Sequence, residues 1–223
     1  MPGVLYMVAT PIGNLGDFSD RARDTLASVS AVVCEDTRVT RKLLQRYELN
    51  KPTLSYHHHS PPQATIALVQ RLQAGESLAY VSDAGTPGLA DPGGKLVSAA
   101  AEAGVQVVPI PGPSAVTAIL SVAGLPANAY MFLGYPPHKK GRVKFFHEVA
   151  EFQNAVVLFE STHRILKTLA ELAGVVGERP LVVGRELTKL HETVYRGTAA
   201  EIIELLKTTS IKGEFVIVVG PDK

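Results

Sequence analysis

The sequence lacks the features that would anchor it in a membrane or cross-link it outside the cell. Cys34 is the single cysteine among 223 residues, which excludes an internal disulfide framework and favours the cytoplasm. It follows an apolar run, so we expect an unreactive core thiol. No apolar run is long enough to span a bilayer, and the first residues have no basic leader or cleavage pattern. We therefore expect a soluble, cytoplasmic protein without a membrane partner.

An excess of charge of either sign is also missing. Lysine and arginine total 22 against 21 aspartate and glutamate, a net charge of +1. Charged residues make up 19% and hydrophobic residues 46%, which argues against disorder and predicts a substantial core. The overall charge indicates neither nucleic-acid nor membrane binding, so an RNA-binding surface would have to be a local basic patch.

Short apolar runs alternate with segments of helical periodicity through the first half of the chain. The expected strands cover residues 4–9, 31–34, 53–57, 78–81 and 105–109. Continuous apolar strands favour a largely parallel sheet with helices on both faces, that is, an α/β fold. We place the domain boundary after Gly124. Residues 1–124 form an N-terminal α/β domain, and residues 125–223, richer in strand patterns, form a C-terminal domain with a mixed sheet and flanking helices.

One stretch, residues 80–94, organises the chain. It reads Y-V-S-D-A-G-T-P-G-L-A-D-P-G-G and connects an expected strand to an expected helix. Four glycines and two prolines fix its backbone shape and allow close approach to a ligand. We interpret it as the wall of a binding site; the alternative is a plain structural loop. Neither this loop nor the loop at residues 10–17 matches the phosphate-binding motifs G-x-x-x-x-G-K-[ST] or G-x-G-x-x-G. The two loops therefore suit an uncharged or partly cationic ligand better than a polyphosphate.

Three consecutive histidines, His57 to His59, raise the question of a metal site. In a strand only the first and third would share a face, and no further ligand pattern completes a set, so we expect no metal. Two basic clusters stand out instead. One lies on the expected helix 37–47 and the other in the loop after the expected strand 130–134. Each alone is typical of a solvated face, but together they would form a rim facing a polyanion.

Seven segments occur in the order found in a known family. They are L-Y-M-V-A-T-P-I-G-N-L-G-D (5–17), C-E-D-T-R-V-T-R-K-L-L (34–44), S-D-A-G-T-P-G-L-A-D-P-G-G (82–94), P-I-P-G-P-S-A (109–115), F-E-S-T-H-R (159–164), G-R-E-L-T-K (184–189) and G-E (213–214). They are spread over nearly the whole chain, from residue 5 to residue 214. This pattern resembles ribosomal RNA small subunit methyltransferase I, a family of the tetrapyrrole methylase superfamily.

The resemblance implies a two-domain tetrapyrrole methylase fold, a homodimer, and S-adenosylmethionine as methyl donor in a cleft between the domains, with no metal. It implies 2′-O-methylation of a cytidine ribose in the decoding region of 16S ribosomal RNA, as free RNA or within the small subunit. Members of the family commonly continue beyond the point where this sequence ends, at Lys223. If that further segment helps to hold RNA in the family, its absence would affect the affinity for the RNA substrate.

Residue by residue, the resemblance places the donor against Ile12, Ala84, Gly85, Thr86, Leu89, Ser114, Ala115, Glu160 and Leu187. Where the superfamily usually carries Gly-Gly-Asp-Pro, this chain has Ala84-Gly85-Thr86-Pro87, which favours the RNA branch. The same fold also admits a methylase of corrin or porphyrin precursors, or an inactive donor-binding protein on the ribosome. RNA would be held by Arg38, Arg41, Lys42, Lys139, Lys140 and Arg142.

Methyl transfer from a sulfonium needs an in-line approach by the ribose oxygen, so positioning should contribute most of the acceleration. A base would help, because a protonated hydroxyl is a poor nucleophile. The candidates at the strand ends are Asp36, Asp83, His57, Glu160 and Glu186. Glu160 and Glu186 lie in donor motifs and are preferred, with a structural salt bridge to Arg164 or Arg185 as the alternative.

Overall fold

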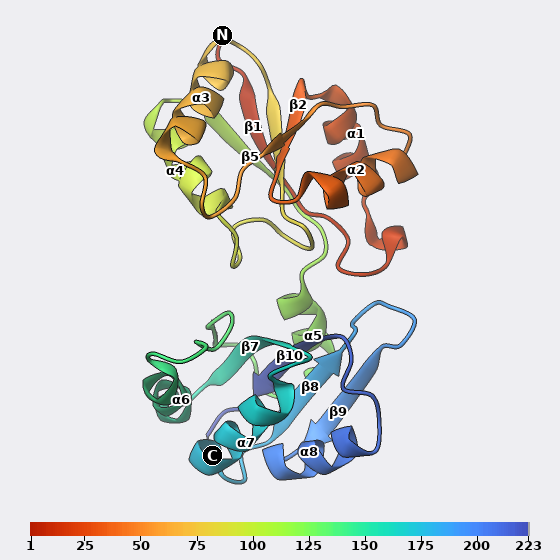
Figure 1. Ribbon diagram of the computed structural model, residues 1–223, viewed down its shortest axis with the longest axis vertical. Helices are drawn as coiled ribbons and strands as arrows, with labels where there is room; N and C mark the ends of the chain where they lie inside the picture. Colours follow the sequence, from red (N-terminus) through yellow and green to blue (C-terminus); the bar gives the residue numbers. More distant parts are fainter. Residues whose placement is uncertain (223) are drawn as a thin grey trace. The chain divides into compact units, whose positions relative to one another are not determined.

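The computed structural model describes residues 1–222 and divides into two compact units (Figure 1). The first unit is Met1–Ser114, and the second begins at Ala115. The division comes one helix before the boundary expected after Gly124. Helix α5 (Ala115–Ala123) contacts β8 (Leu181–Arg185) and β10 (Glu214–Val219), so it packs with the second unit. No helix in the described part of the chain is long and apolar enough to cross a membrane.

A five-stranded sheet with the order β3-β2-β4-β1-β5 forms the centre of the first unit, and every neighbouring pair is parallel. The strands are β1 (Val4–Val8), β2 (Ala31–Cys34), β3 (Thr53–Ser55), β4 (Leu78–Val81) and β5 (Gln106–Ile110). Every residue of β2 and β4 is buried, as expected for strands covered on both faces. Strand β3 ends before the expected point, so His57 lies in an exposed turn after the strand.

Helices cover both faces of this sheet (Figure 1). Helices α1 (Asp20–Ser28) and α2 (Thr37–Arg46) contribute to a core cluster with Val8 and Val81. On the opposite face, α3 (Pro62–Gln73) and α4 (Gly93–Glu102) pack with the side chains of Leu5 and Tyr80. The neighbouring strands β1 and β4 thus send their connections to opposite faces. Their carboxyl ends form the topological switch point where α/β sheets bind ligands.

The second unit contains a mixed sheet with the order β6-β7-β10-β8-β9. Its further strands are β6 (Tyr130–Phe132), β7 (Ala155–Ser161) and β9 (Thr193–Gly197). Strand β6 is parallel to β7, and the other neighbouring pairs are antiparallel. Helices α6 (Arg142–Glu151), α7 (Ile165–Val176) and α8 (Ala199–Lys207) share one core cluster with the strands. The predicted fold class, a parallel N-terminal sheet followed by a mixed C-terminal sheet, is confirmed.

A buried arginine, Arg179, links the residue after β10 to the end of α6 in the second unit. The guanidinium of Arg179 donates hydrogen bonds to the carbonyl oxygens of Gly220, Val149, Ala150 and Asn154. Its side chain is almost inaccessible, and burial lowers its pKa. The carbonyl groups at the ends of α6 and β10 therefore depend on this one donor, because buried acceptors without partners are costly.

We expect Arg179→Met to lower the free energy of unfolding by about 2 kcal/mol, because several buried carbonyl groups lose their donor. Urea denaturation followed by circular dichroism measures the change. Arg21→Met, at an exposed position on α1, is the control and should change stability by less than about 0.5 kcal/mol. Equal stability of the two variants would contradict the role assigned to Arg179.

Candidate functional site

Two backbone hydrogen bonds join the central loop to the loop after β1. The amide of Thr10 donates to the Gly85 oxygen and the amide of Gly85 donates to the Thr10 oxygen, each at 3.0 Å. The Thr10 hydroxyl adds a bond to the Ser82 oxygen at 3.2 Å. These bonds hold the two loops together at the switch point, at the carboxyl ends of β1 and β4.

The loop after β5 joins them. Gly85 has φ +82°, and a Cβ there would lie 3.2 Å from Cγ2 of Ile12 and 3.6 Å from the Pro113 oxygen. The Thr86 hydroxyl donates to that same oxygen at 3.0 Å. The structure thus brings together Ile12, Gly85 and Thr86, which were predicted to hold the donor, beside the turn that precedes Ser114. Ala84 and Leu89 are exposed on the same central loop.

Of the four non-glycine residues with positive φ in the described chain, three lie in loops that match the donor motifs, and the fourth is Glu48. Ala90 in the central loop has φ 66°, and Glu186 and Thr188 after β8 have φ 53° and 65°. Between the latter two, Leu187 is 8% exposed. Its Cδ2 atom would lie 2.9 Å from a Cβ on Gly184, so a larger residue at Gly184 would displace the Leu187 side chain. Strain of this kind persists where surrounding structure imposes it, and it is common at binding sites.

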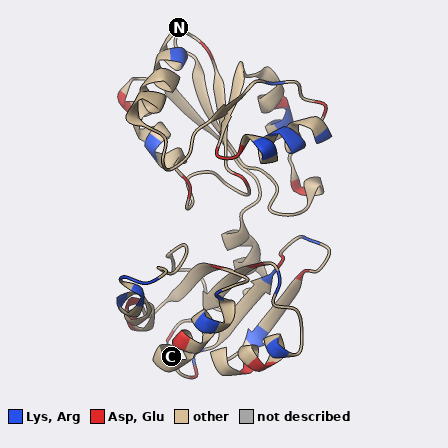
Figure 2. Cartoon of the chain, in the orientation of Figure 1, with Lys and Arg blue, Asp and Glu red and all other residues tan. Residues whose placement is uncertain are grey.

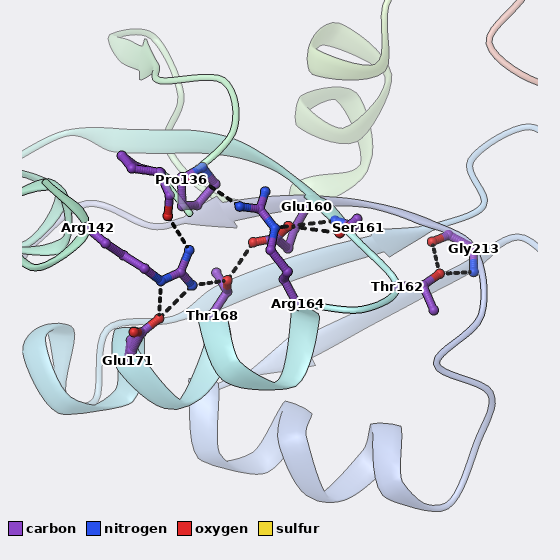
Figure 3. Close-up of polar contacts among 10 residues, drawn as sticks. Pro136, Arg142, Glu160, Ser161, Thr162, Arg164, Thr168, Glu171 and Gly213 are labelled. Atoms are coloured by element: carbon purple, nitrogen blue, oxygen red, sulfur yellow. Dashed lines mark hydrogen bonds and ion pairs between the residues drawn. The ribbon is translucent and has the colours of Figure 1, made fainter. Parts of the chain in front are cut away.

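Glu160 lies inside the second unit (Figure 3). Its side chain is fully buried, and one carboxylate oxygen lies 2.8 Å from Nε of Arg164. That oxygen also accepts a bond from the Ser161 amide at 2.7 Å, while the other accepts the Thr168 hydroxyl at 2.6 Å. Every carboxylate oxygen of Glu160 is therefore occupied. The structure favours the salt bridge with Arg164 over the alternative role as a base.

The same network corrects the assignment of Arg142. We predicted an RNA contact, but this residue is 5% exposed and lies 2.6 Å from the Glu171 carboxylate. Its guanidinium also donates to the Thr168 hydroxyl at 2.7 Å (Figure 3) and to the Pro137 oxygen at 2.9 Å. Arg142 begins α6 and points towards α7, whereas Lys139 and Lys140 before it remain exposed.

Glu160→Gln should lower the free energy of unfolding by about 3 kcal/mol, because it removes one partner of a buried ion pair and leaves Arg164 without its counter-charge. Chemical denaturation and donor titration calorimetry, run on the same preparations, measure stability and binding. Normal stability and donor binding with lost turnover would instead assign Glu160 a role as base.

The other preferred carboxylates are also engaged. Glu186 accepts Nζ of Lys189 and the Glu214 amide, each at 2.9 Å. Burial alone would raise its pKa, but these bonds outweigh burial and hold the pKa below its ordinary value. Asp36 begins α2 as its N-cap, and hydrogen bonds from the side chain and amide of Arg38 lower its pKa to about 2. Neither is poised to accept a proton near neutral pH.

Glu35 is a carboxyl group that sequence reasoning missed. It follows β2 directly and is half-buried. Burial raises its pKa to about 7, with the charges of Asp91 and Asp83 adding to the effect. The motif C-E-D-T-R contains two adjacent carboxylates, Glu35 and Asp36. The sequence alone does not show which of them caps the helix and which is left half-buried.

The raised pKa of Glu35 has a consequence for stability. The ordinary pKa of 4.5 applies when the chain is unfolded, and the folded pKa is about 7, so the folded state binds the proton more tightly. Stability is therefore retained below about pH 4.5 and lost as the pH rises towards 7. Glu35→Gln should be more stable than the parent at pH 8, on the order of 1–2 kcal/mol after allowance for solvent screening, and equal at pH 4.5. Denaturation at both pH values measures this; a pH-independent difference would contradict it.

Lysine and arginine residues gather on α2 (Figure 2). Arg38 pairs with Asp36 at 2.6 Å, and Nε of Arg41 donates to the Thr53 hydroxyl at 3.1 Å. Exposed lysines and arginines without an ion pair or side-chain hydrogen bond to the described residues include Lys42, Arg46, Lys139 and Lys140. These four cations are available to an anionic partner.

His57 and Asp83, the remaining candidate bases, differ in their surroundings. His57 is exposed, and its backbone amide donates to the Ser60 hydroxyl in a tight turn. Asp83 follows β4 and accepts the Asp36 amide at 3.1 Å. Among the described residues, no group of three or more His, Cys, Asp or Glu side chains is arranged to hold a metal ion.

Comparison with known proteins agrees with this geometry. A family model described as Tetrapyrrole (Corrin/Porphyrin) Methylases matches residues 4–203. The crystal structure of a diphthine synthase is similar, with a TM-score of 0.75 at 17% identity, covering 98% of this chain and 90% of that one. The structure of a cobalt precorrin-4 methyltransferase has a TM-score of 0.72 at 18% identity, covering 97% and 94%. The chain therefore belongs to the tetrapyrrole methylases.

Curated relatives narrow this class. A protein of Synechocystis is 45% identical over 98% of this chain and 79% of its own length. Proteins of Escherichia coli and Bacillus subtilis are 42% and 40% identical over 99% and 97% of this chain, and 79% and 75% of their own lengths. All three are named ribosomal RNA small subunit methyltransferase I. Within the tetrapyrrole methylases, that is the family of this chain.

Proposed function

We propose that this protein uses S-adenosylmethionine to methylate the ribose 2′-oxygen of a cytidine in the decoding region of 16S ribosomal RNA. The observation that carries the proposal is the identity of 40–45% with three named rRNA methyltransferases over nearly the whole chain. A tetrapyrrole substrate is the weaker alternative, because the solved tetrapyrrole methylases are similar only in fold, at 16–20% identity.

The residues present fit a donor with a cationic sulfonium. The central loop between Ser82 and Gly94 carries two carboxylates and no lysine or arginine. Beside Leu187, the hydroxyl of Thr188 is buried without a hydrogen-bond partner among the described residues, so it is free to meet a ligand. Ile12, Ala84, Gly85, Thr86, Leu89 and Ser114 in the first unit, with Ala115 and Leu187 in the second, would hold the donor. When bound, it supplies an activated methyl group.

The chain contributes positioning and an acceptor for the ribose proton. Of the carboxyl groups at the ends of β2 and β4, Glu35 has a pKa of about 7, raised by burial, which suits a base at neutral pH. Glu160 and Glu186 instead stabilise the loops that carry donor residues. Glu35→Gln should therefore lower turnover while leaving donor affinity unchanged.

Small ribosomal subunits from a strain that lacks this methylation are the substrate for the deciding experiment. Labelled S-adenosylmethionine is supplied, with free 16S RNA and tetrapyrrole precursors in parallel, and mass spectrometry locates the label. We expect label at one ribose 2′-oxygen in the decoding region. Label on a tetrapyrrole would replace the proposed function, and donor binding without label on any substrate would indicate an inactive binding protein.

In this proposal, the exposed lysine and arginine side chains bind phosphate groups of the RNA. Removing Lys139 and Lys140 together should weaken binding to small subunits and lower the slope of log K against log salt by about 1 to 2, since each lost phosphate contact releases fewer counterions. The control, Lys167→Ala on the exposed surface of α7, should leave both unchanged. An unaltered salt slope in the double variant would remove this loop from the RNA-binding surface.

Two further expectations belong to the same proposal. An rRNA methyltransferase acts where small subunits assemble, which supports a cytoplasmic location. The homodimer implied by the family resemblance is tested by sedimentation of the purified chain, where a monomer at micromolar concentration would contradict it.

A further inference from the structure

We infer that a pocket of the first unit takes one unstacked cytosine base of the RNA substrate. The pocket lies between the loop after β1, helix α2 and the end of β4, and we call it the base pocket. Its lining includes Leu15, Val39, Thr40, Lys42, Leu43 and Asp83. This inference rests on the proposed function, because it names the part of the substrate that the protein reads.

The position of the base pocket suits a substrate. It lies at the topological switch point, where Thr10 and Val81 mark the ends of β1 and β4. Its volume of about 340 Å³ falls within the range of small-ligand sites. None of the residues predicted to hold the methyl donor lines it. The base pocket is therefore separate from the donor residues, although the Thr10–Gly85 bonds connect the two regions.

Apolar walls give the base pocket its shape. Leu15 and Val39 are 43% and 41% exposed, so two large hydrophobic side chains remain uncovered at its edge. The hydroxyl of Tyr47 donates to the Leu15 oxygen and fixes the short 3₁₀ helix η1 (Leu15–Asp17) against α2. Such walls suit the flat faces of a base that has been turned out of its stack, which is how single-stranded RNA is read.

Polar groups in the pocket match the edge of cytosine. Oδ1 of Asp83 accepts the Asp36 amide, and its other oxygen has no bond within the described chain. A free carboxylate oxygen can accept from the exocyclic amine of cytosine. Uracil has a carbonyl at that position, which a carboxylate would repel. The pocket thus favours cytosine over uracil.

Two further groups support this assignment. The Thr40 hydroxyl is 2% exposed, lines the pocket and has no nitrogen or oxygen partner among the described residues; its polar neighbour is the Cys34 thiol, a weak hydrogen-bonding group. Such a hydroxyl can bond the carbonyl of a base. Lys42, on the same helix, is exposed and has no ion pair with any described residue, so it can reach the phosphate that follows the base.

The test compares small subunits that carry cytidine or uridine at the methylated position. The parent should favour the cytidine substrate by about tenfold or more in kcat/KM, the value of one well-placed base contact. In Asp83→Asn the amide oxygen still accepts the Asp36 amide, but its NH2 can donate to a carbonyl. The preference should fall to about threefold or less. An unchanged preference in Asp83→Asn would overturn the inference.

A second variant tests the pocket by filling it. Val39→Trp should reduce methylation of small subunits at least tenfold without changing donor affinity, measured by calorimetry. Ile66→Trp is the control, because Ile66 is also an exposed β-branched apolar residue on a helix of the same unit, α3, and does not line the base pocket. Full activity of Val39→Trp would overturn the inference. If the parent itself methylates no small-subunit RNA, the proposed function fails instead, so the two failures are distinguishable.

Discussion

The paired backbone bonds between Thr10 and Gly85 are the constraint on which the first unit depends. They hold two loops that leave neighbouring strands for opposite faces of the sheet, and without them the switch point would lie open. Around this fixed contact the chain separates two surfaces. The residues predicted for the donor lie by Gly85 and the turn at Pro113, while the base pocket lies by α2. In the proposed reaction, this short bridge would hold the donor residues and the base pocket at a fixed separation, and relative placement contributes most of the rate of a bimolecular reaction.

In the second unit, a buried ion pair fixes the position of a loop, as the backbone bonds do in the first. Glu160 stands on β7 on the face covered by helices, together with Val156 and Leu158, and its oxygens are divided between Arg164, Thr168 and the Ser161 amide. A buried pair of this kind adds little net stability, yet it fixes where the segment after β7 can lie, because breaking it is costly. Glu160 thus determines the local path of the chain between β7 and α7 through its own hydrogen bonds and ion pair.

Much of the fold could be predicted from the sequence, because apolar runs and glycine-rich turns report directly on strands and their ends. The parallel sheet, the mixed sheet and the order of strands and helices follow from such local signals. Side-chain partners could not be predicted in the same way. Alternation along β7 assigns Glu160 to the covered face only once the strand's bounds are known, and Arg142 looked like its neighbours Lys139 and Lys140 until α7 supplied Glu171. Glu35 escaped notice because its raised pKa depends first on burial and then on the charges of Asp91 and Asp83, which lie far along the chain.

The buried side chain of Arg142 reduces the conformational entropy of the loop that precedes α6. Its guanidinium holds the Pro137 carbonyl, and Arg164 holds that of Pro136, so the segment that carries Lys139 and Lys140 is tied at two successive prolines. Ordering a flexible basic loop on RNA would cost free energy at each encounter, whereas a loop already fastened to the core incurs that cost during folding. In the proposed RNA complex, Arg142 would therefore contribute by restricting the motion of this loop, and its charge would stay paired with Glu171.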